Sequence, residues 1–273
     1  MITGGNGEIG QAIISKFKED HQIIYPTRQE MDLEDIHSIN TYLNTLKCNI
    51  DIFIHCAGFN EPKLISNVLI EDLNKTLNIN AISFYKIINN LVINSKIKTN
   101  GYILAISSIY GLFSRKGRFS YASSKHCLNG MIKTLAIDLG RLNIKVNAVS
   151  PGFVDTRLTR NNNSLEKIQS FKQKIPLGRL ANTDDIAEVS VYASTREPEL
   201  AAVEWDAAQK AAFVEMQFDA QHAYYQEHYA GAAFDVILVF GQPAGRLYVS
   251  RVSRLPSRLS AFSTSAENGI LVL

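Results

Sequence analysis

The sequence has little of what marks several classes of protein. Its three cysteines form no CxxC pair, which argues against a disulfide framework or a zinc site and favours a reducing, cytoplasmic compartment. The 28 basic and 26 acidic residues nearly cancel, so we expect neither a basic nucleic-acid-binding protein nor an acidic disordered tail. No apolar run reaches the roughly 20 residues that a membrane-spanning helix needs, and the N-terminus lacks the basic start of a signal peptide. We therefore expect no metal site, no nucleic-acid partner and no membrane partner.

The composition changes sharply near residue 190. Residues 1–190 contain 28 isoleucines and 20 asparagines. Residues 191–273 contain only 2 isoleucines and 1 asparagine, but 15 alanines. Either an Ala-rich helical subdomain follows, or two unrelated coding segments join between Val189 and Ser194. Both explanations predict a first domain over residues 1–190 and a different second part.

Residues 1–190 alternate between apolar runs typical of strands and patterns with helical spacing. The strand runs lie at 23–25, 50–55, 102–106 and 145–149, and the helical patterns at 11–18, 36–46, 72–93, 121–139 and 184–192. This alternation predicts an α/β fold with a Rossmann-type, doubly wound parallel sheet, whose ligands lie beyond the carboxyl ends of the strands. Because only Met1 and Ile2 precede Thr3 and a buried strand usually has about five residues, we expect a truncated first strand.

A glycine-rich loop opens the chain with Gly4, Gly7 and Gly10. Glycines permit a tight turn and the close approach of a pyrophosphate, and the helix that follows offers free N–H groups and the positive end of its dipole. A glycine turn that binds nothing is an equal alternative when this pattern stands alone.

Tyr121 and Lys125 stand four residues apart on a predicted helix, so both lie on one face. An ammonium group beside a phenol favours the phenolate and lowers the phenol pKa from about 10. Such a phenol can exchange a proton with a carbonyl oxygen. In isolation, this spacing is also common among surface residues.

Several short motifs occur in one order along the chain. They are Thr3-Gly4 with Gly7 and Gly10, Cys56-Ala57-Gly58, Asn80, Ser107-Ser108, Tyr121 with Lys125, and Pro151-Gly152 with Thr156. In this combination the sequence resembles the short-chain dehydrogenase/reductase family over residues 2 to about 190. The resemblance implies an NAD(P)(H)-dependent oxidoreductase that moves hydride between nicotinamide and a carbonyl or alcohol carbon of a small molecule, of 3-oxoacyl, sugar or polyol type. It is also compatible with a homo-oligomer, a dimer or a tetramer.

The resemblance assigns roles to individual residues. Tyr121 would be the general acid/base, and Lys125 would hold the nicotinamide ribose and lower the Tyr121 pKa. Ser108 would hydrogen-bond the substrate oxygen, and Asn80 would complete a proton relay with Lys125 through water. The residues that the resemblance places at the cofactor are Gly4, Gly7, Glu8, Ile9, Gly10, Arg28, Asp32, Leu33, Cys56, Ala57, Gly58, Lys125, Pro151, Gly152 and Thr156.

The charges after the run at 23–25 bear on the cofactor. An acidic residue there would bind a ribose 2′-OH, whereas an arginine suits a 2′-phosphate. Arg28 comes first and no acid precedes Glu30, which favours NADP over NAD. Asp32-Leu33 resembles the pair that contacts the adenine.

Some residues depart from the family pattern. His55 stands where an asparagine is usual, and we interpret it as structural. Glu8 occupies a usual glycine position, and the glycine spacing is closer to the sugar-nucleotide-modifying branch. Two alternatives therefore remain: an inactive nucleotide-binding or chimeric protein without a complete site, and a sugar-nucleotide epimerase or dehydratase that retains NAD. Residues 158–174 are polar and asparagine-rich, and we expect a mobile surface loop there.

Residues 191–249 resemble the front half of a GNAT-superfamily N-acetyltransferase, with a helix over 205–229 and a hairpin of 234–240 with 245–249. The acetyl-CoA pyrophosphate loop of that superfamily is missing, so we expect no acetyltransferase activity. Residues 250–273 are Ser/Arg-rich and predict an irregular tail. The segments around Val236 and Val249, or residues 269–272, are alternatives for the last strand of the reductase sheet, which is not recognisable.

Overall fold

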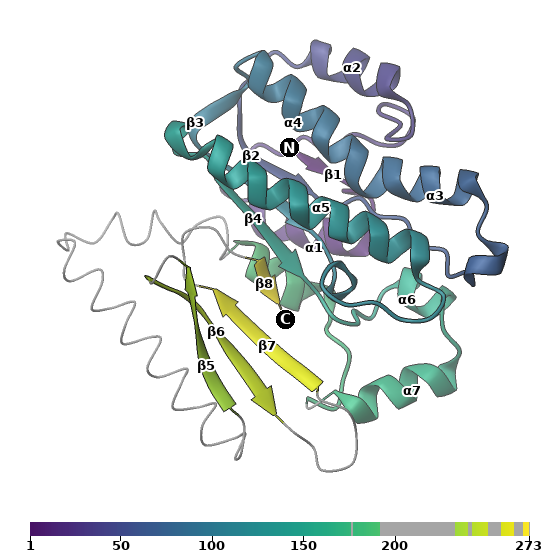
Figure 1. The fold of residues 1–273 in the computed structure, drawn as a ribbon. Coiled ribbons are helices and arrows are strands. Elements are labelled where there is room, and N and C mark those ends of the chain that lie inside the picture. Colours follow the sequence, from purple (N-terminus) through teal and green to yellow (C-terminus); the bar gives the residue numbers. More distant parts are fainter. Residues whose placement is uncertain (176, 192–232, 240–241, 251–257, 265–269, 273) are drawn as a thin grey trace. The chain divides into compact units, whose positions relative to one another are not determined.

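The computed structural model describes residues 1–175, 177–191, 233–239, 242–250, 258–264 and 270–272 (Figure 1). The chain divides into two compact units, Met1–Ser194 with Glu267–Leu273, and Thr195–Ala266. Each unit is described by itself.

The first unit is built on a parallel sheet. Its order is β1-β2-β3-β4-β8, and every neighbouring pair is parallel. The strands are β1 (Ile2–Thr3), β2 (Ile50–His55), β3 (Ile97–Ile106), β4 (Lys145–Ser150) and β8 (Ile270–Val272). Thr3 pairs with His55, His55 with Ala105 and Ala105 with Ala148, so the carboxyl ends of these strands meet at one edge. The expected Rossmann-type sheet and its short first strand are confirmed.

Helices cover both faces of this sheet (Figure 1). They are α1 (Glu8–Phe17), α2 (Ile36–Thr45), α3 (Ile70–Leu77), the π-helical turn η2 (Asn78–Ile82), α4 (Ser83–Ile93), α5 (Phe119–Asp138), α6 (Arg157–Asn161), α7 (Leu165–Lys174) and a helix over 183–191. Successive strand residues face opposite sides. Phe53 packs in a cluster with Phe84 and Leu128 of α4 and α5, whereas Ile54 packs with Ile13 of α1 and Ile186.

Two expected elements differ from the structure. Residues 23–25 form no strand, although the Ile2 amide donates a 2.8 Å hydrogen bond to the Ile24 carbonyl. A two-residue β1 offers too few backbone groups for a longer ladder. The expected helix over 72–93 begins at Ile70 and contains the π-helical turn η2, which interrupts the α-helical pattern between α3 and α4.

The loop expected over residues 158–174 was a wrong prediction, because this segment contains α6 and α7. Ser164 caps α7 by accepting a hydrogen bond from the Lys167 amide. Ile168 and Phe171 are buried in a small cluster with Leu180. The apolar residues at helical spacing thus outweigh the asparagine-rich composition.

The second unit contains an antiparallel sheet of β5 (Ala233–Val239), β6 (Gln242–Ser250) and β7 (Arg258–Thr264). Its β5–β6 pair is the expected hairpin.

The expected irregular tail over 250–273 contains β7 and β8, which is a correction. Residues 270–272 pair with β4, so the last strand of the first unit comes from the second of the two expected alternatives. The expected helix over 205–229 lies outside the described residues.

Across the described residues, no helix is long and apolar enough to cross a membrane. The same residues contain no group of three or more histidine, cysteine or acidic side chains that could hold a metal ion.

Candidate active site

The glycine turn packs β1 against the end of β2. Gly4 has a φ of +70°, and a Cβ on it would lie 2.6 Å from the backbone nitrogen of Ala57. A Cβ on Gly10 would collide with the Gly4 carbonyl oxygen. Larger residues therefore cannot occupy these two positions without moving the backbone, which explains why the sequence has glycine there.

A cavity of about 350 Å³ lies beside this turn. Eight of the residues expected at a cofactor line it, namely Gly4, Gly7, Arg28, Asp32, Leu33, Cys56, Ala57 and Gly58. The other seven do not line it: Glu8, Ile9, Gly10, Lys125, Pro151, Gly152 and Thr156. Ile9 instead packs against the core under α1, where Gly10 is buried.

Arg28 reaches the mouth of this cavity with an exposed side chain. Its Nη2 lies 2.7 Å from Glu34 and its Nε 3.4 Å from Asp32. Both carboxylates also line the cavity. Arg28, the one cation among the described residues that line the cavity, is thus already paired with two anions, which the sequence alone did not indicate.

Lys125 and Tyr121 lie on α5 near the end of β3. Lys125 is 2% exposed, and its ammonium donates a 2.8 Å hydrogen bond to the Ile106 carbonyl. The ammonium lies 5.8 Å from the centre of the Tyr121 ring. A Cβ on Gly58 would be 3.9 Å from the Lys125 Nζ, which places the ammonium next to the wall of the cavity.

Burial dominates the pKa values of this pair. It raises the pKa of the Tyr121 phenol, which a hydrogen bond with Ser108 and the charge of Arg118 then lower. Burial also lowers the pKa of Lys125 to about 8. The expectation that Lys125 lowers the Tyr121 pKa is therefore wrong for this arrangement, because the ammonium is directed to the Ile106 carbonyl.

Asn80 is fully buried in the π-helical turn. Its side-chain amide donates to the Phe59 carbonyl and the Ser124 hydroxyl, both at 2.9 Å, and its side-chain oxygen accepts from the Phe59 amide at 2.7 Å. These three bonds fix the loop after β2 against α5. The expected relay through water remains a prediction.

His55 ends β2 and is fully buried. Its Nδ1 lies 2.9 Å from the Thr3 hydroxyl, and its ring packs near Phe53 and Phe84. Burial and the nearby Lys125 lower the His55 pKa to about 3. A neutral, buried ring that joins β1 to β2 fits the structural role that we expected for it.

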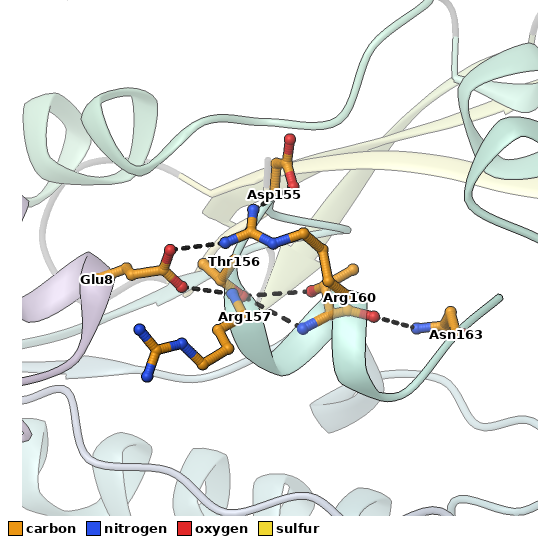
Figure 2. A network of polar contacts seen from close by, with 7 residues as sticks. Glu8, Asp155, Thr156, Arg157, Arg160 and Asn163 are labelled. Atoms are coloured by element: carbon orange, nitrogen blue, oxygen red, sulfur yellow. Dashed lines mark hydrogen bonds and ion pairs between the residues drawn. The ribbon is translucent and has the colours of Figure 1, made fainter. Parts of the chain in front are cut away.

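Glu8 lies at the start of α1 and contacts α6 (Figure 2). Its carboxylate accepts hydrogen bonds from the Arg157 amide and, at 2.8 Å, from the Arg160 guanidinium. Arg160 also binds Asp155 at 2.7 Å. Figure 2 shows Thr156, the N-cap of α6, within the same network. The Glu8 side chain, which stands where a glycine is usual, is thus bound to α6 and does not line the cavity.

Sequence reasoning missed Arg118. This residue precedes α5 and is only 5% exposed. Its guanidinium carbon lies 5.6 Å from the centre of the Tyr110 ring, and the Tyr110 and Tyr121 rings are 6.2 Å apart. A basic run, Arg115-Lys116-Gly117-Arg118, just before Tyr121 was the available signal.

Comparison with known proteins gives concordant matches. Residues 11–198 match a family model described as enoyl-(acyl carrier protein) reductase. The chain is 28% identical to a 3-oxoacyl-[acyl-carrier-protein] reductase of Buchnera aphidicola subsp. Acyrthosiphon pisum, over 72% of this chain and 89% of that protein. It is 31% identical to the same reductase of Chlamydia trachomatis, over 70% of this chain and 78% of that protein.

Solved structures show the same fold. A short chain dehydrogenase family protein from Francisella tularensis matches with a TM-score of 0.64 and 26% identity, over 70% of this chain and 88% of that one. A short chain dehydrogenase from Burkholderia cenocepacia in complex with NADP has a TM-score of 0.63, 22% identity and the same coverage. These matches cover the first 200 or so residues, and the resemblance of residues 191–249 to an acetyltransferase gains no support from them.

Proposed function

This chain belongs to the short-chain dehydrogenase/reductase family, and on that premise we propose that it is an NAD(P)(H)-dependent oxidoreductase. It transfers hydride between nicotinamide and a carbonyl or alcohol carbon of a small molecule, of 3-oxoacyl, sugar or polyol type. The supporting observation is that Ser108 follows β3 while Tyr121 and Lys125 share α5, with the Lys125 ammonium next to the wall of the cavity at the glycine turn.

The residues around the cavity fit a dinucleotide. The cavity volume of about 350 Å³ is within the range of cofactor sites. The turn brings backbone rather than side chains to its wall, and no side chain caps the N-terminus of α1, so its first N–H groups remain for a phosphate. When bound, the dinucleotide supplies or accepts the hydride.

We assign each side chain a part in the proton transfer. In the reduction, the carbonyl carbon gains the hydride, and the Tyr121 hydroxyl donates its proton to the carbonyl oxygen. The Ser108 hydroxyl, which lowers the pKa of Tyr121, holds that oxygen. Lys125 binds the ribose hydroxyls and resupplies the proton through water, in a relay with Asn80. Its pKa of about 8 suits a group that both gives and accepts protons near neutral pH.

The cofactor-binding residues are proposed as a set. Gly4, Gly7, Glu8, Ile9 and Gly10 form the pyrophosphate turn, Arg28, Asp32 and Leu33 the adenosine side, and Cys56, Ala57 and Gly58 the wall of the cavity. Pro151, Gly152 and Thr156 would meet the nicotinamide carboxamide. NADP(H) is the preferred cofactor, because Arg28 lies at the cavity mouth where a 2′-phosphate would be bound.

A Tyr121→Phe substitution tests the function. Removing one hydroxyl should abolish reduction of 3-oxoacyl thioesters and other ketones, by at least about 1,000-fold in kcat, because the variant lacks the proposed proton donor. Dinucleotide binding, followed by fluorescence titration, should change less than about threefold. Turnover that persists in this variant would exclude the mechanism. Binding without any turnover in the wild type would identify a nucleotide-binding protein instead.

We further propose a cytoplasmic homo-oligomer. The three free cysteines fit a reducing compartment. Tyr85, Phe119 and Ile137 on α4 and α5 are 52%, 48% and 77% exposed, and we propose that a second copy of the chain covers them. Light scattering on the purified chain tests whether it forms a dimer or a tetramer.

The proposed domain boundaries are 1–190 for the catalytic domain, 191–249 for the acetyltransferase-like fragment and 250–273 for the remainder.

A further inference from the structure

Arg118 is a buried cation beside the proposed catalytic phenol. It lies three residues before Tyr121 and is 5% exposed. Its guanidinium carbon lies 5.6 Å from the centre of the Tyr110 ring, which meets the Tyr121 ring edge-on. Its Nη1 is buried and has no hydrogen-bond partner among the residues that the structure describes.

Neighbouring cations differ from Arg118 in their partners. Lys63, whose backbone forms a bridge with that of Arg118, binds Asp72 at 2.7 Å and Glu61 at 3.1 Å. Arg115 donates a 3.3 Å hydrogen bond to the Tyr110 hydroxyl. The groups that act on the charge of Arg118 are Tyr110, Arg115 and Tyr121, and in the described part of the chain none of them is a carboxylate.

An unpaired buried guanidinium is unfavourable unless an anion completes it. Arg118 lies over the Tyr110 ring and Arg115 donates to the Tyr110 hydroxyl. With no acid beside Arg118 in the described residues, this leaves a positive site next to Tyr121. The planar fork of an arginine matches the two oxygens of a carboxylate. A neutral thioester or ketone would leave this charge without a counterion.

We propose that Arg118 binds a carboxylate of the substrate, so that the enzyme acts on oxo acids and their hydroxy-acid products. This inference rests on the proposed function and narrows its substrate class. Because Arg118 and Tyr121 share the Tyr110 ring, the carboxylate lies close to the reacting carbonyl, as in a 2- or 3-oxo acid.

Arg118 could instead serve only to favour the Tyr121 phenolate, since its charge lowers the phenol pKa. The two roles have different consequences. A group that acts on the phenol alone affects acid and ester substrates equally and shifts the pH profile. A carboxylate-binding group affects the acids alone, mainly through KM.

Matched substrate pairs separate these roles. We would measure kcat/KM for 3-oxobutanoate and 3-oxohexanoate against their methyl esters, with saturating NADPH or NADH. The wild type should prefer each acid at least tenfold, and Arg118→Gln should bring that ratio to about one. Arg118→Lys should retain part of the preference, and the exposed Arg141→Gln should retain all of it. Equal loss for acids and esters in Arg118→Gln, or no preference in the wild type, would overturn the proposal.

A binding measurement keeps the test independent of turnover. Malonate should raise the Tm of the wild type and of Arg141→Gln but not that of Arg118→Gln. Without malonate, the Tm of Arg118→Gln should equal or exceed the wild-type value, because an unpaired buried charge has been removed. If the wild type reduces no carbonyl compound, the proposed function fails while the malonate shift still tests Arg118. An absent shift in the wild type refutes the carboxylate site.

Discussion

The proton affinity of individual buried groups decides what this site can do. The Lys125 ammonium is 2% exposed and is bound to a single described carbonyl, that of Ile106. Burial favours the neutral amine and holds the pKa near 8, whereas the same burial favours the protonated form of Tyr121. At neutral pH both groups therefore carry a proton, which suits a site that must donate one to a carbonyl oxygen.

The pKa of Lys125 has a consequence for stability. The folded pKa of about 8 lies below the ordinary value of 10.5, so between these pH values the unfolded chain binds more protons than the folded one. Stability of the wild type relative to Lys125→Met should then rise as pH increases from 8 to 10.5, by about 2–3 kcal/mol. Urea unfolding at each pH measures this difference. Lys133→Met, on the exposed side of α5, is the matched control. Parallel stability curves for wild type and Lys125→Met would contradict the prediction.

Cofactor preference is a second property of single residues. Arg28→Asp should remove the tighter binding of NADPH, taking its advantage over NADH from about tenfold or more to about one. Glu34→Gln should strengthen NADPH binding several-fold, because it frees the Arg28 Nη2 that lies 2.7 Å from Glu34. Fluorescence titration of both nucleotides measures these ratios, with Arg141→Asp as the control. A wild type that binds NADH equally well would refute the preference for NADP.

At the scale of elements, the turn η2 and the helix α6 shape the site. A π-helical turn inserts one residue into a helix and is frequent at functional sites. Here it lies in η2 between α3 and α4, where Asn80 is directed toward Phe59 and Ser124. Helix α6 is bound to α1 through Glu8. Its partners Arg157 and Arg160 lie 149 and 152 residues further along the chain. The same contact holds Thr156 at the start of α6, next to the proposed nicotinamide site.

The contact between α1 and α6 can be measured by a double-mutant cycle on Glu8 and Arg160. Both side chains are half exposed, so the coupling should be small but measurable and should weaken with salt. The matched pair Lys16 and Glu188 joins α1 to the helix over 183–191 at 3.2 Å and lacks a third charged partner in the described residues. Its coupling should be smaller than that of Glu8 and Arg160. A Glu8–Arg160 coupling no larger than that of the control would show that the network does not hold α6.

At the scale of the whole molecule, the sequence predicted the repeating parts of the fold better than its exceptions. Apolar runs predicted β2, β3 and β4, since a parallel sheet buried on both faces needs them. The segment at 23–25 has the same composition but forms no strand beside the two-residue β1. The spacing of Ser108, Tyr121 and Lys125 singled out the site. The burial of Arg118 and the direction of the Lys125 ammonium depend on tertiary packing, which spacing does not encode.

The sheet of the first unit is completed from the far end of the chain, and this closure can be tested. In β8, residues 270–272 pair with Ala148, Val149 and Ser150 of β4, so that β4 has a neighbour on each side. A proline in this ladder removes a backbone donor. Leu271→Pro should lower the free energy of unfolding by about 1–3 kcal/mol more than Leu271→Ala does, because alanine keeps the N–H group. Urea unfolding measures both variants. If the two variants have equal stability, β4 does not depend on residues 270–272 and forms the edge of the sheet in solution, where an unpaired strand favours aggregation.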